Sequence, residues 1–161
     1  MLADLQVKNI GRVDLPGIGS AGISSSRKTG DEALLSFVSY TNPGTIYRLD
    51  LGKGTREVLE ATKIPGYNPD DYVTEQVFYT SKDGTRVPMS ITRRKDVKPD
   101  GKNPVLLYGY GGFNYSLSPT FRPWRLLWLD NGGIYAEANL RGGSEYGDKW
   151  HEAGTKMQKQ N

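Results

Sequence analysis

Residues 104–114 read PVLLYGYGGFN, a short apolar run that passes directly into a glycine-rich one. A continuous apolar run is typical of a strand that is covered on both faces, as in a parallel sheet. Glycine and asparagine tolerate unusual backbone angles, and the run has them at four positions: Gly109, Gly111, Gly112 and Asn114. We therefore expect a buried strand that ends in a sharply bent loop.

The residues that follow predict a helix and a second strand. Residues 121–129 (FRPWRLLWL) have a helical pattern, with proline near the first turn and the stop signal NGG at 131–133. Residues 134–140 (IYAEANL) are a strand candidate that ends in RGG. A strand, loop, helix and strand with short connections are typical of an α/β sheet, whose chemistry lies at the carboxyl ends of its strands. Both glycine-rich segments, 109–112 and 142–143, fall at such ends.

The first sixty residues have a different rhythm. Strand-like runs at 34–40, 45–51 and 56–60 are separated by the turns TNPG and GKGT. Such spacing is typical of an antiparallel meander, sandwich or propeller blade. Residues 61–70 are rich in Pro and Gly and have little periodicity, which predicts a boundary there. Beyond it, residues 75–81 and 86–93 flank an Asp-Gly turn and predict a hairpin.

Charge and composition exclude several classes of protein. Lys and Arg number 21 against 18 Asp and Glu, and they are scattered, so we expect no nucleic-acid or membrane partner. The absence of cysteine excludes disulfides, thiol catalysis and Cys-ligated metal. Residues 1–5 lack the basic start and apolar middle of a secretory signal. We expect a soluble protein of the cytoplasm, or of the periplasm where a longer parent carries an upstream signal.

Three motifs resemble binding or catalytic sites, but the residues around each of them do not fit that function. GIGSAG at 17–22 matches the dinucleotide fingerprint, but a polar, turn-rich stretch follows where a helix is required, so we interpret it as a loop. Ser144 in GSEYG misses the nucleophile-elbow pattern because Tyr146 stands where glycine is needed. His151 is the only histidine and has no serine in a suitable setting, so we expect a packed or surface residue.

The loop at 108–114 is a stronger candidate because it carries two large aromatic side chains, Tyr110 and Phe113. A tyrosine hydroxyl presented by such a loop can donate a hydrogen bond to a developing oxyanion, and a phenylalanine can wall an apolar pocket. The alternative is a glycine-rich connection whose aromatic residues pack inward. The residues alone do not decide between the two.

The sequence resembles the prolyl oligopeptidase family of serine peptidases. The resemblance is carried by LYGYGGFN at 107–114, ANLRGGSEYG at 138–147, WHEAG at 150–154 with KQN at 159–161, the hairpin around SKDGT at 81–85, and YTNPGTIY at 40–47. It implies an α/β plus β fold: partial antiparallel β-propeller blades in residues 1–65, then the first strands and helix of an α/β-hydrolase sheet in residues 66–161.

The resemblance also implies a role for each site residue. Tyr110 stands where the family places a tyrosine that binds the oxyanion, and Phe113 where it places an aromatic wall of the proline pocket. The remaining residues are expected as structural supports: Gly109, Gly111, Gly112, Asn114, Arg141 and Glu145. The family cleaves short peptides on the carboxyl side of proline without metal or cofactor, and we expect the complete enzyme to be a monomer.

The family's nucleophile, aspartate and histidine lie downstream of the matched segment. We therefore expect this chain to be a central slice that is inactive alone, with open sheet edges and uncovered apolar faces such as 105–107 that favour aggregation. Two alternatives stay open: a non-catalytic module that binds proline peptides, and a small β-rich interaction domain whose glycine-rich loops are only turns.

Overall fold

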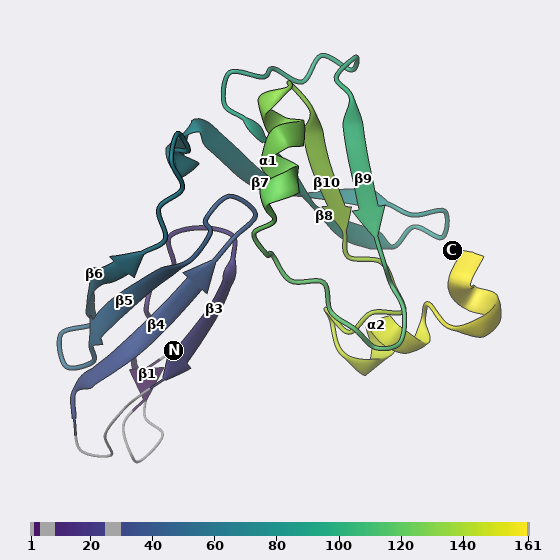
Figure 1. Ribbon diagram of the computed structural model, residues 1–161. Coiled ribbons are helices and arrows are strands. Elements are labelled where there is room, and N and C mark those ends of the chain that lie inside the picture. The colour runs from purple at the N-terminus through teal and green to yellow at the C-terminus, as the bar shows by residue number, and fades with distance from the viewer. Residues whose placement is uncertain (1, 4–8, 25–29, 161) are drawn as a thin grey trace. The chain divides into compact units, whose positions relative to one another are not determined.

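The computed structural model describes residues 2–3, 9–24 and 30–160 (Figure 1). These residues divide into two compact units. The first unit contains Met1–Asn68 with Pro119–Phe121, and the second contains Pro69–Ser118 with Arg122–Asn161. Each unit is described in turn.

The first unit is a four-stranded antiparallel sheet. Its strands are β3 (Ser20–Ser24), β4 (Glu32–Val38), β5 (Thr45–Asp50) and β6 (Thr55–Ala61), and they pair in chain order. Two short strands, β1 (Leu2–Ala3) and β2 (Asn9–Gly11), form a separate antiparallel pair. The strands expected at 34–40, 45–51 and 56–60 are therefore confirmed, each within a few residues.

One face of this sheet carries the core of the first unit. Alternate residues of β4 and β5 are buried, because successive side chains of a strand point to opposite faces. The core cluster joins Ala33, Leu35, Phe37, Tyr47 and Leu49. Every residue of β6 is exposed, including the apolar Val58 and Leu59. The last strand of this sheet therefore presents uncovered apolar surface.

The segment at 17–22 differs from its expected conformation. It enters strand β3, where Gly22 lies opposite Ser36 of β4, instead of forming a loop throughout. The loop interpretation was wrong for its second half, because pairing with β4 is a long-range contact that local turn residues do not report. A helix that opens on Gly22, as a dinucleotide site requires, is not formed.

The second unit is a mixed sheet in the order β7-β8-β10-β9. Strands β7 (Tyr72–Thr80) and β8 (Arg86–Arg94) form the predicted hairpin, after the short 3₁₀ helix η1 (Pro69–Asp71). Strand β9 (Val105–Gly109), helix α1 (Pro123–Asp130) and strand β10 (Ile134–Ala138) form a βαβ unit, with β9 and β10 parallel. Helix α2 (Asp148–Glu152) and the 3₁₀ helix η2 (Lys156–Gln160) follow. The predicted strand–helix–strand arrangement is confirmed.

Burial in this sheet differs sharply between the two parallel strands. All five residues of β10 are buried, since β10 lies between β8 and β9 and α1 packs on it. All five residues of β9 are exposed, with Leu107 at 65%. The expectation of a buried strand at 104–108 was therefore wrong. The apolar run does mark a strand, but β9 is at the sheet edge, and no described residue covers its outer side; the uncovered faces expected at 105–107 are present.

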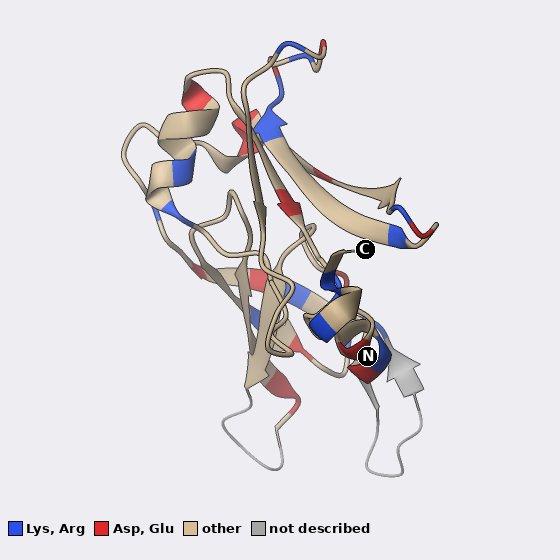
Figure 2. Cartoon of the chain, turned by 90° about the vertical axis from the view of Figure 1, so that its right-hand side faces the viewer, with Lys and Arg blue, Asp and Glu red and all other residues tan. Residues whose placement is uncertain are grey.

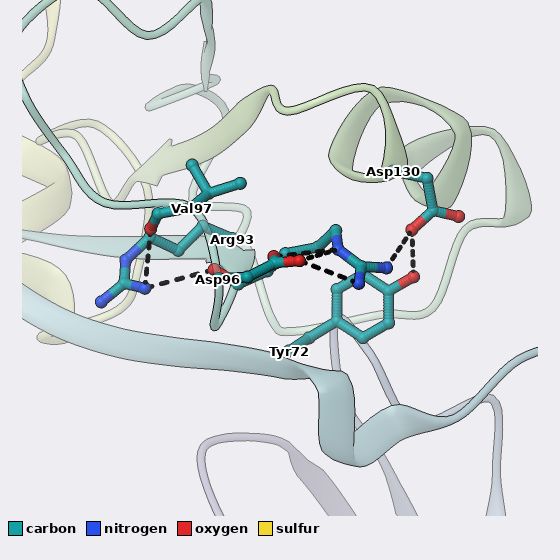
Figure 3. Close-up of polar contacts among 6 residues, drawn as sticks. Tyr72, Arg93, Asp96, Val97 and Asp130 are labelled. Atoms are coloured by element: carbon teal, nitrogen blue, oxygen red, sulfur yellow. Dashed lines mark hydrogen bonds and ion pairs between the residues drawn. The ribbon is translucent and has the colours of Figure 1, made fainter.

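A polar cluster holds together the end of the sheet where β10 begins (Figure 3). The Tyr72 hydroxyl donates to the carboxylate of Asp130 at the end of α1, and Arg94 Nη1 donates to the same oxygen at 3.3 Å. Arg94 also pairs with Asp96 at 3.0 Å. Burial, with help from the hydrogen bond to Asp130, raises the pKa of Tyr72 to about 12. Arg93 donates to the Val97 carbonyl at 3.1 Å nearby. These contacts join β7, β8 and α1 at the end of the sheet away from the glycine-rich loops.

Basic and acidic residues are interspersed along the chain, as Figure 2 shows, and the formal net charge is +3. Among the described residues, every helix is too short or too polar to traverse a lipid bilayer. The same residues contain no group of three or more His, Cys, Asp or Glu side chains placed to hold a metal ion.

Candidate functional site

The two glycine-rich segments leave the sheet side by side. Strand β9 ends at Gly109 and strand β10 at Ala138, and the parallel register places these two residues opposite each other. The loops that follow, 110–118 and 139–147, therefore start from the same edge of the sheet. In open α/β sheets this carboxyl edge is where ligands bind.

The two loops are in backbone-to-backbone contact. A Cβ atom at Gly142 would lie 2.2 Å from the Gly111 carbonyl oxygen, and a Cβ at Gly111 would lie 2.5 Å from Leu140 Cβ. The Asn114 amide donates to the Gly142 carbonyl at 3.1 Å. Side chains at either glycine would force the loops apart. Close approach, more than flexibility, therefore explains these two glycines.

The backbone of the first loop is unusual at an unexpected residue. Gly111 and Asn114 have φ of 57° and 56°, in line with the bent loop that the sequence predicts. Phe113, with φ of 52°, also lies in the left-handed region. For a residue with a bulky side chain this conformation costs roughly 1–2 kcal/mol, so it persists only where the surroundings impose it. Here the amides of Asn114 and Tyr115 are held by the carbonyls of Gly142 and Gly112.

This backbone presents aromatic rings to solvent. Phe113 is 90% exposed and Tyr110 is 45% exposed, with their ring centroids 6.5 Å apart. Tyr115, which the sequence reasoning did not single out, packs edge-on against Tyr110 at 6.0 Å. The aromatic residues of this loop therefore do not pack inward.

Arg141 ties the second loop to the β7–β8 hairpin. Its guanidinium binds both carboxylate oxygens of Asp83, at 2.5 and 3.0 Å, and donates to the hydroxyls of Thr85 and Ser81 at 3.0 and 3.3 Å. The Arg141 side chain is 9% exposed. The hydrogen bonds from Arg141, followed by one from the Thr85 amide, hold the pKa of Asp83 well below its ordinary value. The sequence reasoning treated Asp83 only as a turn residue, and no local signal connects it to Arg141.

Glu145 joins the far end of the first loop to the end of β10. Its Oε1 accepts hydrogen bonds from the Leu117 amide at 3.0 Å and from Asn139 Nδ2 at 3.3 Å. Next to it, the Ser144 hydroxyl lies 2.8 Å from the Ser116 hydroxyl. Glu145 and Ser144 thus connect the two loops.

The single histidine lies against the backbone of the same region. His151 Nδ1 is 2.7 Å from the Gly142 carbonyl oxygen, and because a carbonyl can only accept, this nitrogen donates. Among the described residues, no serine hydroxyl is hydrogen-bonded to His151. The nucleophile–base pair that a serine peptidase needs is therefore not assembled within the described residues.

Two family models match the chain on either side of the predicted boundary. The prolyl oligopeptidase N-terminal β-propeller domain matches residues 2–62, and the prolyl oligopeptidase family model matches residues 119–161. The chain belongs to the prolyl oligopeptidase family. Its first sheet is part of a β-propeller, and its second unit contains the first strands and helix of an α/β-hydrolase sheet.

Relatives and solved structures agree with this assignment. The chain is 51% identical to the prolyl endopeptidase of Elizabethkingia miricola over 96% of its own length and 22% of that protein. It is 48% identical to the prolyl oligopeptidase of Omphalotus olearius over 96% of its own length and 21% of that protein. It superposes with a TM-score of 0.87 on apo prolyl oligopeptidase B of Galerina marginata, at 36% identity over 98% of this chain and 23% of the other. The chain thus spans about a fifth of the length of its curated relatives.

Proposed function

We propose that this chain supplies part of the active site of a serine-type endopeptidase that cleaves short peptides on the carboxyl side of proline. The observation that carries the proposal is the loop after β9, which presents Tyr110 and Phe113 together at the carboxyl edge of the sheet. Prolyl oligopeptidase B of Galerina marginata has been solved with a 35-residue hydrolysis and macrocyclization substrate, which supports a peptide as the ligand.

We also propose which domain of the enzyme each part of the chain belongs to. Residues 1–65 are the C-terminal part of the propeller, and residues 66–161 are the N-terminal part of the hydrolase domain. The break between compact units at Asn68 and Pro69 supports this boundary. The nucleophile, its base and the second oxyanion donor come from outside this chain.

Tyr110 acts on the oxyanion. When the nucleophile attacks the scissile carbonyl, the oxygen gains negative charge, and the Tyr110 hydroxyl donates a hydrogen bond to it. Such a donor accelerates the reaction only if it is already in place, because its effect comes from binding the transition state more tightly than the substrate. The backbone contacts of Gly111 and Asn114 with the second loop provide that support.

Phe113 receives the proline. The proline side chain is an apolar ring with no donor, so a flat apolar surface suits it better than a polar one. The left-handed backbone at Phe113 directs the ring into solvent, where it is free to form one wall of a pocket. Arg141 and Glu145 support the two loops without touching the peptide.

The chain alone is predicted to be inactive. No acyl-enzyme can form without a serine activated by a base, and the only histidine is bound to the Gly142 carbonyl. A fluorogenic peptide with proline before the reporter group should release no more fluorophore than buffer does. Turnover that a serine-directed inhibitor abolishes would overturn this prediction.

A second candidate function is a non-catalytic module that binds proline peptides. It is favoured by the 90% exposure of Phe113 next to the Tyr110 ring, which also packs against Tyr115, since binding needs this surface and not the catalytic set. Titration of the full chain with a short proline peptide, with calorimetry as the readout, tests this binding function. Phe113→Ala should weaken a measurable affinity, whereas Tyr110→Phe, which keeps the ring, should not. Absence of affinity in the unmodified chain contradicts the binding function.

A further inference from the structure

Lys159 connects the two glycine-rich loops. It lies in η2, close to the end of the described chain, and its ammonium donates to the carbonyl of Gly111 and, at 2.9 Å, to the carbonyl of Arg141. These carbonyls lie 48 and 18 residues away in sequence. One side chain therefore bridges three segments that are far apart along the chain.

The chemistry of the contact suits lysine. An ammonium group has three donors and no acceptor, so it can serve two carbonyl oxygens at once. Among the described residues, Lys159 makes no ion pair with a carboxylate. Its charge is instead directed at the two backbone oxygens, and hydrogen bonds to charged groups are stronger than those between neutral groups.

The two carbonyls that Lys159 binds belong to residues that determine how the loops are placed. Gly111 directly follows Tyr110, and the peptide group is planar, so holding the Gly111 carbonyl also sets the direction of the Gly112 amide. A Cβ at Gly111 would lie 2.9 Å from the Lys159 ammonium. The Arg141 carbonyl belongs to the residue whose guanidinium is bound to Asp83. Lys159 thus completes a continuous series of hydrogen bonds from the β7–β8 hairpin to the loop that carries Tyr110 and Phe113.

We propose that Lys159 is a positioning residue. Its two hydrogen bonds to the Gly111 and Arg141 carbonyls, here called the clasp, hold the two loops together and keep the Tyr110 loop in its bent conformation. The effect of the clasp on peptide recognition rests on the proposed function, whereas its effect on the position of the loops does not. Removal of the ammonium frees both carbonyls, and the loops then separate more often.

Amide hydrogen exchange of the full chain, resolved by NMR, tests the clasp. The reporters are the amides of Asn114 and Gly142, which are bonded across or beside the contact, and the reference is the Gly84 amide in the hairpin turn. Lys159→Met keeps an unbranched apolar stem and removes the donors. Because a hydrogen bond to a charged group is lost, exchange at both reporters should rise about tenfold, with Gly84 unchanged.

Three further variants make the experiment decisive. Lys159→Arg keeps a cationic donor and should restore most of the protection, which a merely space-filling role would not predict. Lys149→Met, an exposed lysine of the neighbouring helix, should leave the reporters unchanged. Lys159→Gln replaces the methionine variant if that protein does not fold. Exchange at Asn114 and Gly142 equal to that of the unmodified chain, in the variant that folds, would overturn the proposal.

Peptide titration of the same variants separates the two proposals. If the unmodified chain binds a proline peptide, Lys159→Met should weaken that affinity several-fold, and Lys159→Arg should weaken it less. If the unmodified chain binds no peptide, the binding function fails, while the exchange comparison still decides the role of Lys159.

Discussion

At the scale of single residues, the site depends on side chains that bind backbone or each other across long sequence distances. Arg141 and Asp83 are 58 residues apart, and their paired hydrogen bonds connect the hairpin to the second glycine-rich loop. Such bidentate arginine–carboxylate contacts add geometric specificity as well as energy. The Arg141 contact therefore contributes to both stability and loop position.

The pKa of Asp83 predicts a dependence of stability on pH. Because Arg141 lowers this pKa in the folded chain below the value of about 3.9 in the unfolded chain, the ionised carboxylate stabilises the fold above about pH 4. That contribution is lost as the pH falls through the folded value. Urea unfolding of the chain and of Asp83→Asn should therefore differ at pH 7 and converge below pH 4.

Asp31→Asn provides the matched control, since Asp31 is exposed and its side chain makes no hydrogen bond or ion pair within the described residues. Its difference from the unmodified chain should stay small at each pH. A difference between Asp83→Asn and the unmodified chain that stays constant from pH 7 to pH 2 would contradict the role given to the Arg141–Asp83 pair.

At the scale of elements, the candidate site is built from two loops that touch through their backbones. Parallel pairing of β9 with β10 brings their ends together, and glycine at both contact points allows the loops to pack directly. Protein interiors are close-packed and adjust little to added volume. A single methyl group should therefore disturb the whole loop pair.

Gly142→Ala should be strongly destabilising. Gly142 has φ of 102°, and the added Cβ would lie 2.2 Å from the Gly111 carbonyl oxygen. The backbone strain and the overpacking together should lower the free energy of unfolding by about 3 kcal/mol. Urea denaturation at neutral pH measures the change.

Gly132→Ala is the control that separates the cost of backbone strain from the cost of overpacking in Gly142→Ala. Gly132 also has a positive φ, 81°, but a Cβ added there would have no atom within 4 Å. The substitution should cost only the conformational part, about 1–2 kcal/mol. Equal losses at the two glycines would show that the contact between the loops adds nothing to the strain.

At the scale of the whole molecule, two strands of the chain expose apolar side chains. Strand β9 is an edge strand with apolar side chains in solvent, and β6 is exposed along its whole length. Unpaired edges and apolar patches of this kind promote association between chains. The chain should therefore self-associate as its concentration rises.

Leu107→Lys should reduce this association. Leu107 is 65% exposed on the edge strand, and a charge there opposes pairing of one edge with another. Sedimentation velocity over a tenfold concentration range should show a smaller shift toward large species for this variant. Leu127→Lys, at an exposed leucine of α1, is the control. Association that Leu127→Lys reduces as much as Leu107→Lys would locate the contact elsewhere.

The sequence by itself determined the elements and their class. The strand-like runs that became β4 and β5, the Asp-Gly hairpin between β7 and β8, and the strand–helix–strand succession after residue 104 are local signals, and each corresponds to an observed element. The presence of bent backbone at Gly111 and Asn114 was equally predictable, because it follows from residue type.

Only the tertiary structure decided how these elements meet. Burial of β10 and exposure of β9 depend on sheet order, which an apolar run does not reveal. The left-handed backbone of Phe113, the Arg141–Asp83 pair and the Lys159 contact with Gly111 arise from packing between distant segments. Periodicity and turn chemistry act over a few residues, whereas the candidate site is held by contacts between segments tens of residues apart.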